Sequence, residues 1–405
     1  MLDLRPSARG VELRGKMLEF MEDEVLPAEQ ELAGHRQEPG LDRTVPDVIF
    51  RLMAEARRRG LWNLFLPSES GIGQLDYAGI AEVSGWSIDL APAAINGQAP
   101  DTGNMELIHL FGTPEQKDRW LKPLLDGAIR SAFAMTEPDV ASSDASNIET
   151  EIVRDGDEWV INGRKWWTSG AADPRCEILI VMGKTDPTAA RHRQQTMVLV
   201  PADTPGVTVV RDVPVFGRYD HHGHCEVLFE NVRVPVENVL GEVGEGFAAA
   251  QARLGPGRIH HCMRALGAAE RALDLMVTRA RDRVAFGRPL IDQGTIQRDI
   301  AESRLEIDQA RLMCLRTARL IDVAGNQAAA LEVSKAKVIV PNVALKVIDR
   351  AIQVHGGAGV SDDVPLTAMY GWHRAMRIFD GPDEVHLRSI ARAESRAPRG
   401  LEVLR

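Results

Sequence analysis

The order of hydrophobic patterns along the chain constrains its fold more than any single motif does. Up to about residue 130, apolar residues recur at helical spacing, as in residues 11–32 and 45–59. From Ser131 to about residue 240 the chain breaks into short runs of strand length, separated by clusters of Gly, Asp and Pro. After Gly246 long helical patterns return. The sequence therefore predicts an α+β fold with an N-terminal helical domain (1–130), a middle antiparallel β domain (131–240) and a C-terminal helical bundle domain (241–405).

Local signals predict where individual elements begin and end. Thr113 followed by Pro114 is typical of a helix start, and Gly60 is a stop signal. Asn162-Gly163 predicts a β-hairpin over residues 160–166. No helical run interrupts the strands, which favours an antiparallel barrel or sandwich. The expected strands are 158–161, 178–182, 196–200, 207–210 and 226–229, and the expected long helices are 247–283, 296–323 and 328–354.

Composition excludes several classes of protein. A net charge of −10, from 58 acidic and 48 basic side chains, argues against a nucleic-acid partner. No apolar run approaches the roughly 20 residues needed to span a bilayer, and residues 1–16 mix charges in a way unlike a secretory signal. The four cysteines form no Cys-x-x-Cys pair. They are expected to be reduced thiols in a cytoplasmic protein.

Two groups of histidines are candidate metal ligands. His221, His222 and His224 cluster in a predicted loop, but no acidic or cysteine partner stands at a characteristic spacing. His260 and His261 are adjacent on a predicted helix, so they point to different faces and cannot chelate together. The sequence therefore predicts no metal site.

Four strings contain side chains suited to binding or catalysis, and each also has a plain structural interpretation. Residues 135–144 (MTEPDVASSD) bring small donors to the end of a strand, where on composition alone a surface turn is more typical than a binding loop. The two tryptophans in residues 165–169 (KWWTS) are more often core. Residues 353–359 (QVHGGAG) follow no strand, which excludes a Rossmann phosphate loop. Asp380-Gly381 is a common turn pair.

Together these strings resemble the acyl-CoA dehydrogenase family, along nearly all of the chain. Residues 281–290 (RDRVAFGRPL) and 380–386 (DGPDEVH) also resemble motifs of this family. The strings MTEPDVASSDA, NGRKWW, LGPGRIHHCMR and DGPDEVH are similar to the dehydrogenase module of the large vertebrate members that also carry a kinase-like domain. The resemblance implies FAD as cofactor and α,β-dehydrogenation of an acyl-CoA thioester. It also implies that the C-terminal helical domain is a four-helix bundle.

The resemblance assigns Asp380 as the base that removes the α proton. The family normally has glutamate there, whereas the kinase-linked subgroup also has aspartate. Glu384, in the place of a usual flavin-contacting glutamine, is the second candidate for the base. Arg258 matches an arginine near the catalytic carboxylate, and Pro382 lies in the same motif.

The remaining roles implied by the resemblance concern the flavin and CoA. Thr136, next to Met135, and Thr168 contact the flavin ring, and Trp166 packs against it. Trp167 is expected to be core. The loop has Asp139–Ser142 where the family commonly has glycines and is one residue longer, so the assignment of Ser143 to the CoA portion is less direct. Arg283 and Phe286 match residues that contact the flavin of a neighbouring subunit. Gln353, Gly356 and Gly357 match a turn that closes on the adenosine half of FAD.

The contact to a neighbour's flavin implies a homotetramer built as a dimer of dimers, or at minimum a dimer. The implied electron acceptor is electron-transfer flavoprotein. Two alternatives stay open: a nitroalkane-oxidase-like flavoprotein, which also uses an aspartate base and passes electrons to oxygen, and a non-catalytic flavin-bound scaffold. The length, branching and hydroxylation of the acyl group are not encoded in a readable pattern.

Overall fold

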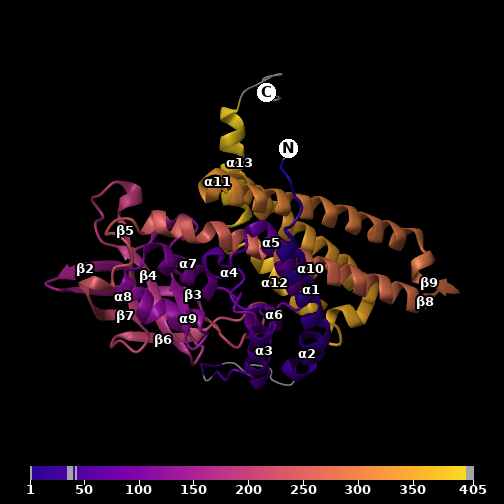
Figure 1. The fold of residues 1–405 in the computed structure, drawn as a ribbon, viewed down its shortest axis with the longest axis horizontal. Coiled ribbons are helices and arrows are strands. Elements are labelled where there is room, and N and C mark those ends of the chain that lie inside the picture. The colour runs from indigo at the N-terminus through magenta and orange to yellow at the C-terminus, as the bar shows by residue number, and fades with distance from the viewer. Residues whose placement is uncertain (1, 34–39, 42, 398–405) are drawn as a thin grey trace. The chain divides into compact units, whose positions relative to one another are not determined.

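The computed structural model describes residues 2–33, 40, 41 and 43–397 (Figure 1). They divide into two compact units, each built from segments far apart in the sequence. We call residues 1–23, 71–91 and 258–405 the helical unit, and residues 24–70 and 92–257 the sheet unit. The three domain boundaries expected from the sequence stay a prediction.

A seven-stranded sheet organises the sheet unit, with strand order β1-β4-β2-β3-β7-β6 and β5 paired with β4. All five expected strand runs lie within strands of this sheet. Most strand pairs are antiparallel, as expected, but β1 pairs with β4 in parallel and β2 meets β4 in parallel at one position. The β2–β3 hairpin lies between β1 and β4 in the sequence and is long enough for the crossover that parallel pairing requires. The strands are β1 (Arg130–Ala134), β2 (Glu151–Asp155), β3 (Glu158–Ser169), β4 (Cys176–Lys184), β5 (Gln195–Pro201), β6 (Val207–Asp212) and β7 (His224–Pro235).

The Asn162-Gly163 pair does not form the predicted hairpin turn. It lies inside the continuous strand β3, and the turn between β2 and β3 is at Gly156, whose φ is 64°. The pairing of β3 with β7 shifts register between Ile161 and Gly163. A Cβ on Gly163 would lie 2.3 Å from Thr150 Oγ1, so close approach to the residue directly before β2, and not a turn, requires this glycine.

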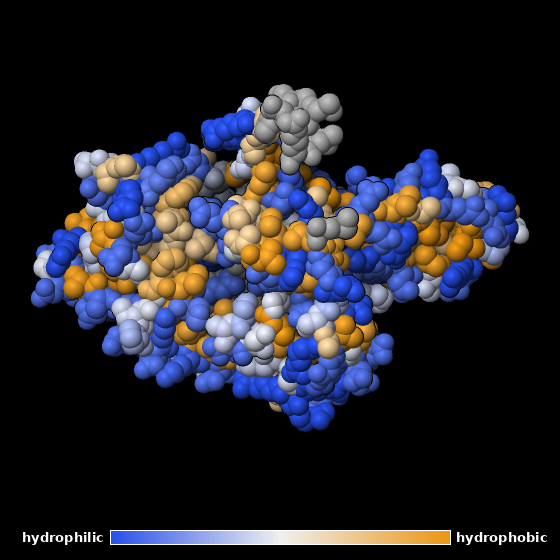
Figure 2. Space-filling view, turned by 45° about the horizontal axis from the view of Figure 1, so that its top comes forward, coloured by the Kyte–Doolittle hydropathy of each residue, from blue (hydrophilic) through white to orange (hydrophobic). Residues whose placement is uncertain are grey.

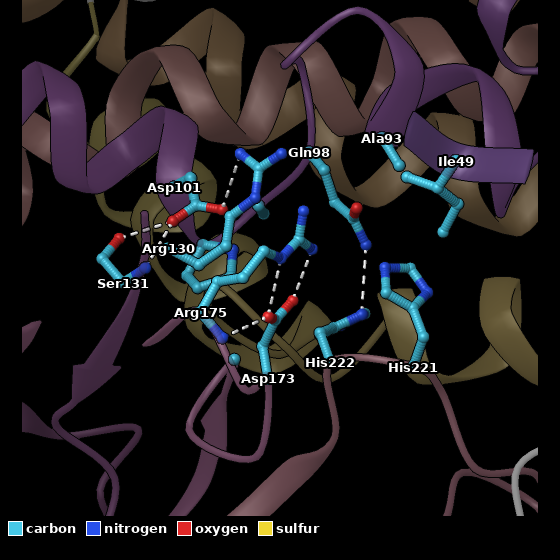
Figure 3. A pocket seen from close by; sticks show the side chains of 13 residues that line it. Ile49, Ala93, Gln98, Asp101, Arg130, Ser131, Asp173, Arg175, His221 and His222 are labelled. Carbon is cyan, nitrogen blue, oxygen red and sulfur yellow. Dashed lines mark hydrogen bonds and ion pairs between the residues drawn. The ribbon is translucent and has the colours of Figure 1, made fainter. Parts of the chain in front are cut away.

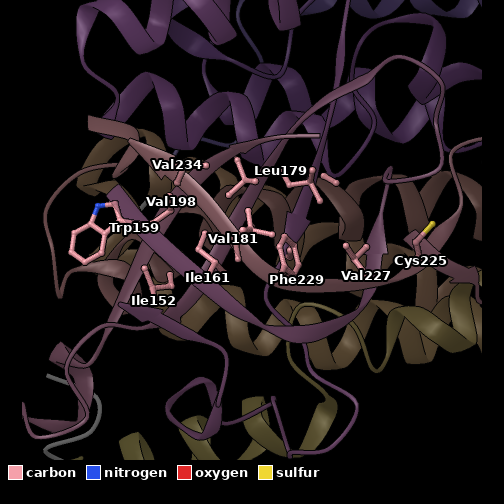
Figure 4. Packing of buried hydrophobic residues seen from close by; sticks show 14 residues of the cluster. Ile152, Trp159, Ile161, Leu179, Val181, Val198, Cys225, Val227, Phe229 and Val234 are labelled. Atoms are coloured by element: carbon pink, nitrogen blue, oxygen red, sulfur yellow. The ribbon is translucent and has the colours of Figure 1, made fainter. Parts of the chain in front are cut away.

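Alternating apolar residues of the strands form the core of the sheet unit (Figure 4). Full burial of each such side chain contributes roughly 1.5–3 kcal/mol to the stability of the fold. This core fixes the register of β3, and therefore the positions of the polar residues at its end. Central members are Ile152, Trp159, Ile161, Leu179, Val181, Val198, Val227 and Phe229.

Short helices complete the sheet unit. In α3 (Asp47–Arg58), Val48, Leu52 and Met53 are buried, as its amphipathic pattern predicts. The predicted helix start at Thr113 is confirmed, because its side chain and that of Gln116 form a reciprocal capping box. The others are α2 (Leu26–Ala33), α4 (Pro67–Ser70), α7 (Asp101–Phe111), α8 (Pro114–Gln116), η2 (Lys117–Leu121), α9 (Lys122–Leu125), η3 (Ala145–Asn147), η4 (Arg191–Arg193) and η5 (Val236–Asn238). Two short helices contain residues of both units: η1 (Met21–Val25) and α6 (Leu90–Ala94).

Long helices dominate the helical unit, as the sequence predicts. Helix α11 breaks at Gly325, whose φ is 82°, and this divides it into the two expected helices. The elements are α1 (Ala8–Phe20), α5 (Gln74–Ser84), α10 (Gly246–Asp282), which belongs to this unit from Arg258 onward, β8 (Val284–Ala285), β9 (Arg288–Pro289), η6 (Leu290–Asp292), α11 (Gly294–His355), η7 (Gly356–Val360), α12 (Leu366–Met376) and α13 (Asp383–Arg396).

Two glycines allow α5 and α10 to pack closely. A Cβ on Gly85 would lie 1.9 Å from the carbonyl oxygen of Arg264, and a Cβ on Gly267 would lie 1.8 Å from that of Glu82. Any side chain at either position would force the backbones apart. This packing fixes the segment of α10 that carries the candidate catalytic residues.

The molecular surface in Figure 2 mixes hydrophilic with scattered hydrophobic residues. Among the helices that the structure describes, none is long and apolar enough to cross a membrane.

Candidate active site

A turn between α12 and α13 presents Asp380 in the helical unit. Asp380 has a φ of 55° and Gly381 a φ of 98°, so two consecutive residues adopt left-handed conformations. Such a conformation is uncommon for a residue other than glycine and is concentrated at functional sites. The Asp380 side chain is 22% exposed, which leaves the carboxylate accessible but largely removed from water.

The buried ammonium of Lys337 holds the backbone of this turn. Lys337 Nζ donates to the carbonyl oxygens of Met376, at 2.5 Å, and Phe379, at 2.9 Å, and lies 3.5 Å from that of Gly381. Burial lowers the pKa of Lys337, and the nearby Asp380 carboxylate opposes this shift. Lys337 was not among the predicted site residues. Its signal was a lysine on the apolar face of a helix, between Val333 and Val340.

Two further side chains contact the carbonyl of Asp380 itself. Arg258 Nε donates to this oxygen at 2.7 Å, and His386 Nε2 lies 3.3 Å from it. The structure therefore brings Arg258 to Asp380, although through the backbone of the residue. Burial and the charges of Arg258 and Lys337 lower the pKa of His386 to about 4, so this imidazole is neutral near pH 7.

His261 lies beside the carboxylate and was not predicted as a site residue. Its Nε2 is 3.6 Å from Asp380 Oδ2, and its ring packs against Phe379 with centroids 5.0 Å apart. His260 points elsewhere, with Nε2 2.7 Å from Gln74 Oε1, which confirms that the adjacent histidines face different ways. The available signal was spacing, because His261 follows Arg258 by three residues on one helix.

Helix α13 begins directly after this turn, with Pro382 at its N-cap. Asp383 is buried and accepts from Arg377 Nε at 2.8 Å and from Asn342 Nδ2 at 3.1 Å, which anchors the first turn of the helix. Glu384 is exposed. A partly desolvated carboxylate is a stronger base than a solvated one, so the environment favours Asp380 over Glu384 as a proton acceptor.

In the sheet unit, the loop after β1 is fixed to β3 by a buried ion pair. Lys165 Nζ donates to Glu137 Oε1 at 2.8 Å and to the carbonyl oxygens of Met135, at 2.9 Å, and Met182, at 2.6 Å. Burial lowers the pKa of Lys165 to about 8, against the influence of Glu137. The backbone N–H of Trp166 donates to the carbonyl oxygen of Thr136 at 2.9 Å. The structure thus brings the predicted Met135–Thr136 and Trp166–Thr168 segments together.

Two buried polar atoms in this region lack a hydrogen-bond partner among the described residues. They are Trp166 Nε1 and Thr168 Oγ1. Buried polar groups are normally hydrogen-bonded, so this pair indicates a ligand with polar edge atoms. A flavin ring has such atoms, and these residues fit it. Trp167 is 39% exposed, and the prediction that it is core was wrong. Its φ of 52° lies at a register shift between Lys165 and Thr168 that turns its side chain outward.

The two serines of the loop differ in environment. Ser142 is buried, and its Oγ accepts from the N–H of Glu137 at 2.9 Å. Ser143 is exposed. The sheet unit therefore uses Ser142 to shape the loop, whereas the assignment of Ser143 as a ligand contact stays a prediction.

The other predicted cofactor residues lie on the surface of the helical unit. Arg283 precedes the β8–β9 hairpin, and Phe286 at its tip is 100% exposed with a φ of 53°. Gln353, Gly356 and Gly357 are also exposed, at the end of α11. A fully exposed aromatic ring at a hairpin tip is typical of a contact surface.

A small cavity lies within the sheet unit, between the 98–101 segment and the loops after β3 and before β7 (Figure 3). Its volume is about 10 Å³, which suits one water molecule and not a substrate. Asp101 accepts from Ser131, and Asp173 pairs with Arg175 at 2.7 Å. These contacts indicate a structural role for the cavity lining.

Models of the N-terminal, middle and C-terminal domains of acyl-CoA dehydrogenases match residues 9–128, 132–232 and 244–394. The chain is 65% identical to Probable acyl-CoA dehydrogenase FadE2 of Mycobacterium tuberculosis, over 97% of each chain. It is 51% identical to human Acyl-CoA dehydrogenase family member 11 over 96% of this chain and 50% of that protein. The chain thus spans about half the length of this human relative.

Solved structures give the same result. A structure described as an acyl-CoA dehydrogenase from Mycobacterium abscessus superposes with a TM-score of 0.93 and 49% identity, covering 96% of this chain and 99% of that one. Butyryl-CoA dehydrogenase of Megasphaera elsdenii gives a TM-score of 0.82 and 28% identity, with 98% and 100% coverage. The chain belongs to the acyl-CoA dehydrogenase family, whose members are FAD-dependent oxidoreductases.

Proposed function

We propose that this protein catalyses α,β-dehydrogenation of an acyl-CoA thioester, with Asp380 as the base that removes the α proton. The observation that carries the proposal is the environment of Asp380. Its carboxylate stands on a left-handed turn whose carbonyls are held by Lys337 and Arg258. A base fixed in this way loses little freedom when a substrate binds, which favours proton transfer.

Partial burial prepares Asp380 for this role. Aspartate is one methylene shorter than the glutamate usual in the family, so a fixed backbone matters more for its reach. An acyl chain that displaces the remaining water would further disfavour the ionised carboxylate and make it a stronger base. His261, 3.6 Å from the carboxylate, lies where it can influence that proton equilibrium.

FAD, when bound, supplies the acceptor for the β hydride. We propose that Met135, Thr136, Trp166 and Thr168 hold its ring, with Ser143 near the CoA portion. The partnerless Trp166 Nε1 and Thr168 Oγ1 support this assignment.

The other cofactor contacts that we propose are Pro382 and Glu384, next to the base, and the exposed residues of the helical unit. Arg283 and Phe286 would act on the flavin of a neighbouring subunit, in a homotetramer or at least a dimer. Electron-transfer flavoprotein is the proposed electron acceptor. The exposed residues near the end of α11 with a proposed role at the adenosine half are Gln353, Gly356 and Gly357.

The test compares Asp380→Asn with Glu384→Gln, which makes the same chemical change four residues away. FAD-loaded proteins are mixed anaerobically with a panel of acyl-CoA esters, and flavin bleaching is followed in a stopped-flow instrument. We expect Asp380→Asn to retain FAD and slow bleaching by at least about three orders of magnitude, and Glu384→Gln to have a milder effect.

Near wild-type bleaching in Asp380→Asn, with loss in Glu384→Gln, would exchange the two roles. Turnover of nitroalkanes to peroxide under air, without any CoA ester, would favour the oxidase alternative. A wild-type flavin that no CoA ester bleaches would favour a scaffold.

A further inference from the structure

The connection between β6 and β7 brings together three side chains with metal-binding chemistry. One ligand atom from each of Asp220, His222 and His224 lies within 4.8 Å of the other two. His222 and His224 are buried, and Asp220 is half-buried. The spacing of residues in the sequence did not identify an acidic partner for the histidine cluster. In the structure that partner is Asp220, which directly precedes the cluster.

The distances from the Asp220 carboxylate to the two imidazoles suit a small cation. Asp220 Oδ2 is 2.8 Å from His224 Nε2 and 3.8 Å from His222 Nε2. Metal–ligand bonds of 2.0–2.2 Å at a tetrahedral zinc place neighbouring ligand atoms about 3.4 Å apart. The two observed distances bracket this value. The longer one exceeds a hydrogen bond, so direct hydrogen bonding does not fully account for the convergence.

The other nitrogen of each imidazole is held by a side chain outside the cluster. His224 Nδ1 lies 2.7 Å from Ser169 Oγ, and His222 Nδ1 lies 3.1 Å from the Gln98 amide nitrogen (Figure 3). Exchange of the oxygen and nitrogen of the Gln98 amide by a half-turn lets it accept from Nδ1–H. Histidine ligands in metalloproteins usually have such a partner on the second nitrogen, which fixes the tautomer and leaves Nε2 for the metal.

The backbone around the cluster is held in place before any ion binds. The N–H of His224 donates to Asp212 Oδ1 at 2.7 Å, and Asp212 forms a buried ion pair with Arg43. The carbonyl of Gly223 accepts from the N–H of Gly170 at 3.0 Å. Gly223 has a φ of 67°, and a Cβ there would lie 2.9 Å from that of Ala172. Ligands on a fixed backbone bind an ion with little loss of conformational entropy.

We propose that Asp220, His222 and His224 form a binding site for a borderline divalent transition-metal ion, with Zn²⁺ or Co²⁺ as suitable occupants. Two imidazoles and one carboxylate favour such ions over Mg²⁺ or Ca²⁺, which prefer all-oxygen sites. Water completes the coordination in a three-ligand site. With Nε2 on the metal, His224 carries its proton on Nδ1, where it can donate to Ser169 Oγ. The ion would join the β6–β7 connection to His224, the first residue of β7.

The experiment titrates Zn²⁺ into tag-free, FAD-loaded, full-length protein stripped with a chelator. Isothermal titration calorimetry is expected to show one equivalent per chain. His222→Asn and Asp220→Asn should each weaken binding by at least about 100-fold, since loss of a ligand exceeds the 10–100-fold effect of losing its hydrogen-bond partner. Ser169→Ala should fall within that smaller range.

The matched control is His221→Asn, the same substitution one residue away and outside the cluster. It should leave Zn²⁺ affinity unchanged within about two-fold, and the X-ray absorption spectrum of the bound zinc should show two imidazoles. The flavin absorbance and the melting temperature of each variant establish that it is folded. Absence of saturable one-to-one binding, or equal losses in His221→Asn and His222→Asn, would overturn the proposal.

Discussion

Replacing Lys165 by methionine should destabilise the protein and weaken FAD binding together. Lys165 is fully buried, and its ammonium donates to Glu137 and to the carbonyls of Met135 and Met182. Removing one partner of a buried ion pair typically costs about 3–5 kcal/mol. Glu137 keeps donors from Glu149 and Thr150, so we expect a value of about 3 kcal/mol, at the lower end of this range.

The pH dependence has a defined sign. Burial places the pKa of folded Lys165 near 8, below the value of 10.5 for an unperturbed lysine. Between these values the unfolded chain binds more protons than the folded one, so the contribution of Lys165 to the free energy of unfolding rises with pH. The rise amounts to about 3 kcal/mol over this window, and Lys165→Met should remove it.

Denaturant unfolding at fixed protein and FAD concentrations, repeated from pH 7 to 10.5, measures the loss of stability and its pH dependence. Lys184→Met, at the end of strand β4 in the same sheet, is the matched control and should be nearly neutral. Glu137→Gln and the double variant complete a thermodynamic cycle, in which we expect a coupling of about 2 kcal/mol. A single-variant loss below about 1 kcal/mol, with no coupling, would refute the view that this pair holds the loop.

Two further predictions concern burial and assembly. Burial raises the pKa of Glu106 to about 8 from 4.5, so wild-type stability should fall relative to Glu106→Gln as pH rises through this window, by up to about 5 kcal/mol, in parallel unfolding titrations. Phe286→Ala and Arg283→Ala should lower FAD affinity and shift light scattering toward smaller species. A wild-type monomer that retains FAD would contradict the proposed contact between subunits.

Sequence patterns predicted the elements well because local and long-range preferences agree along most of the chain. The strand runs and the break at Gly325 follow from apolar periodicity and from a glycine at a positive φ. The pair Asn162-Gly163 gave a wrong prediction because its glycine allows the close approach of Thr150, the residue directly before the paired strand β2. Trp167 misled in a similar way, since a register shift in β3 decided its orientation. In both cases strand pairing outweighed the local preference.

The candidate active site shows the same division between local and distant information. The Asp380 turn and the Trp166–Thr168 strand are contiguous strings, so their residues could be named from the sequence. Lys337, which holds the backbone of the Asp380 turn, precedes Asp380 by 43 positions in the sequence.

A contact between residues so far apart in the sequence can be predicted only where the residue type conflicts with the hydrophobic pattern around it. Lys337 has that conflict, because a lysine on an apolar helix face must find carbonyls or a carboxylate to be buried. Asp220 has none: an aspartate in a polar loop fits its pattern whether or not it meets His224. A charged residue in an apolar pattern therefore indicates a buried contact from sequence alone, whereas a polar residue in a polar loop requires the folded chain to reveal its partners.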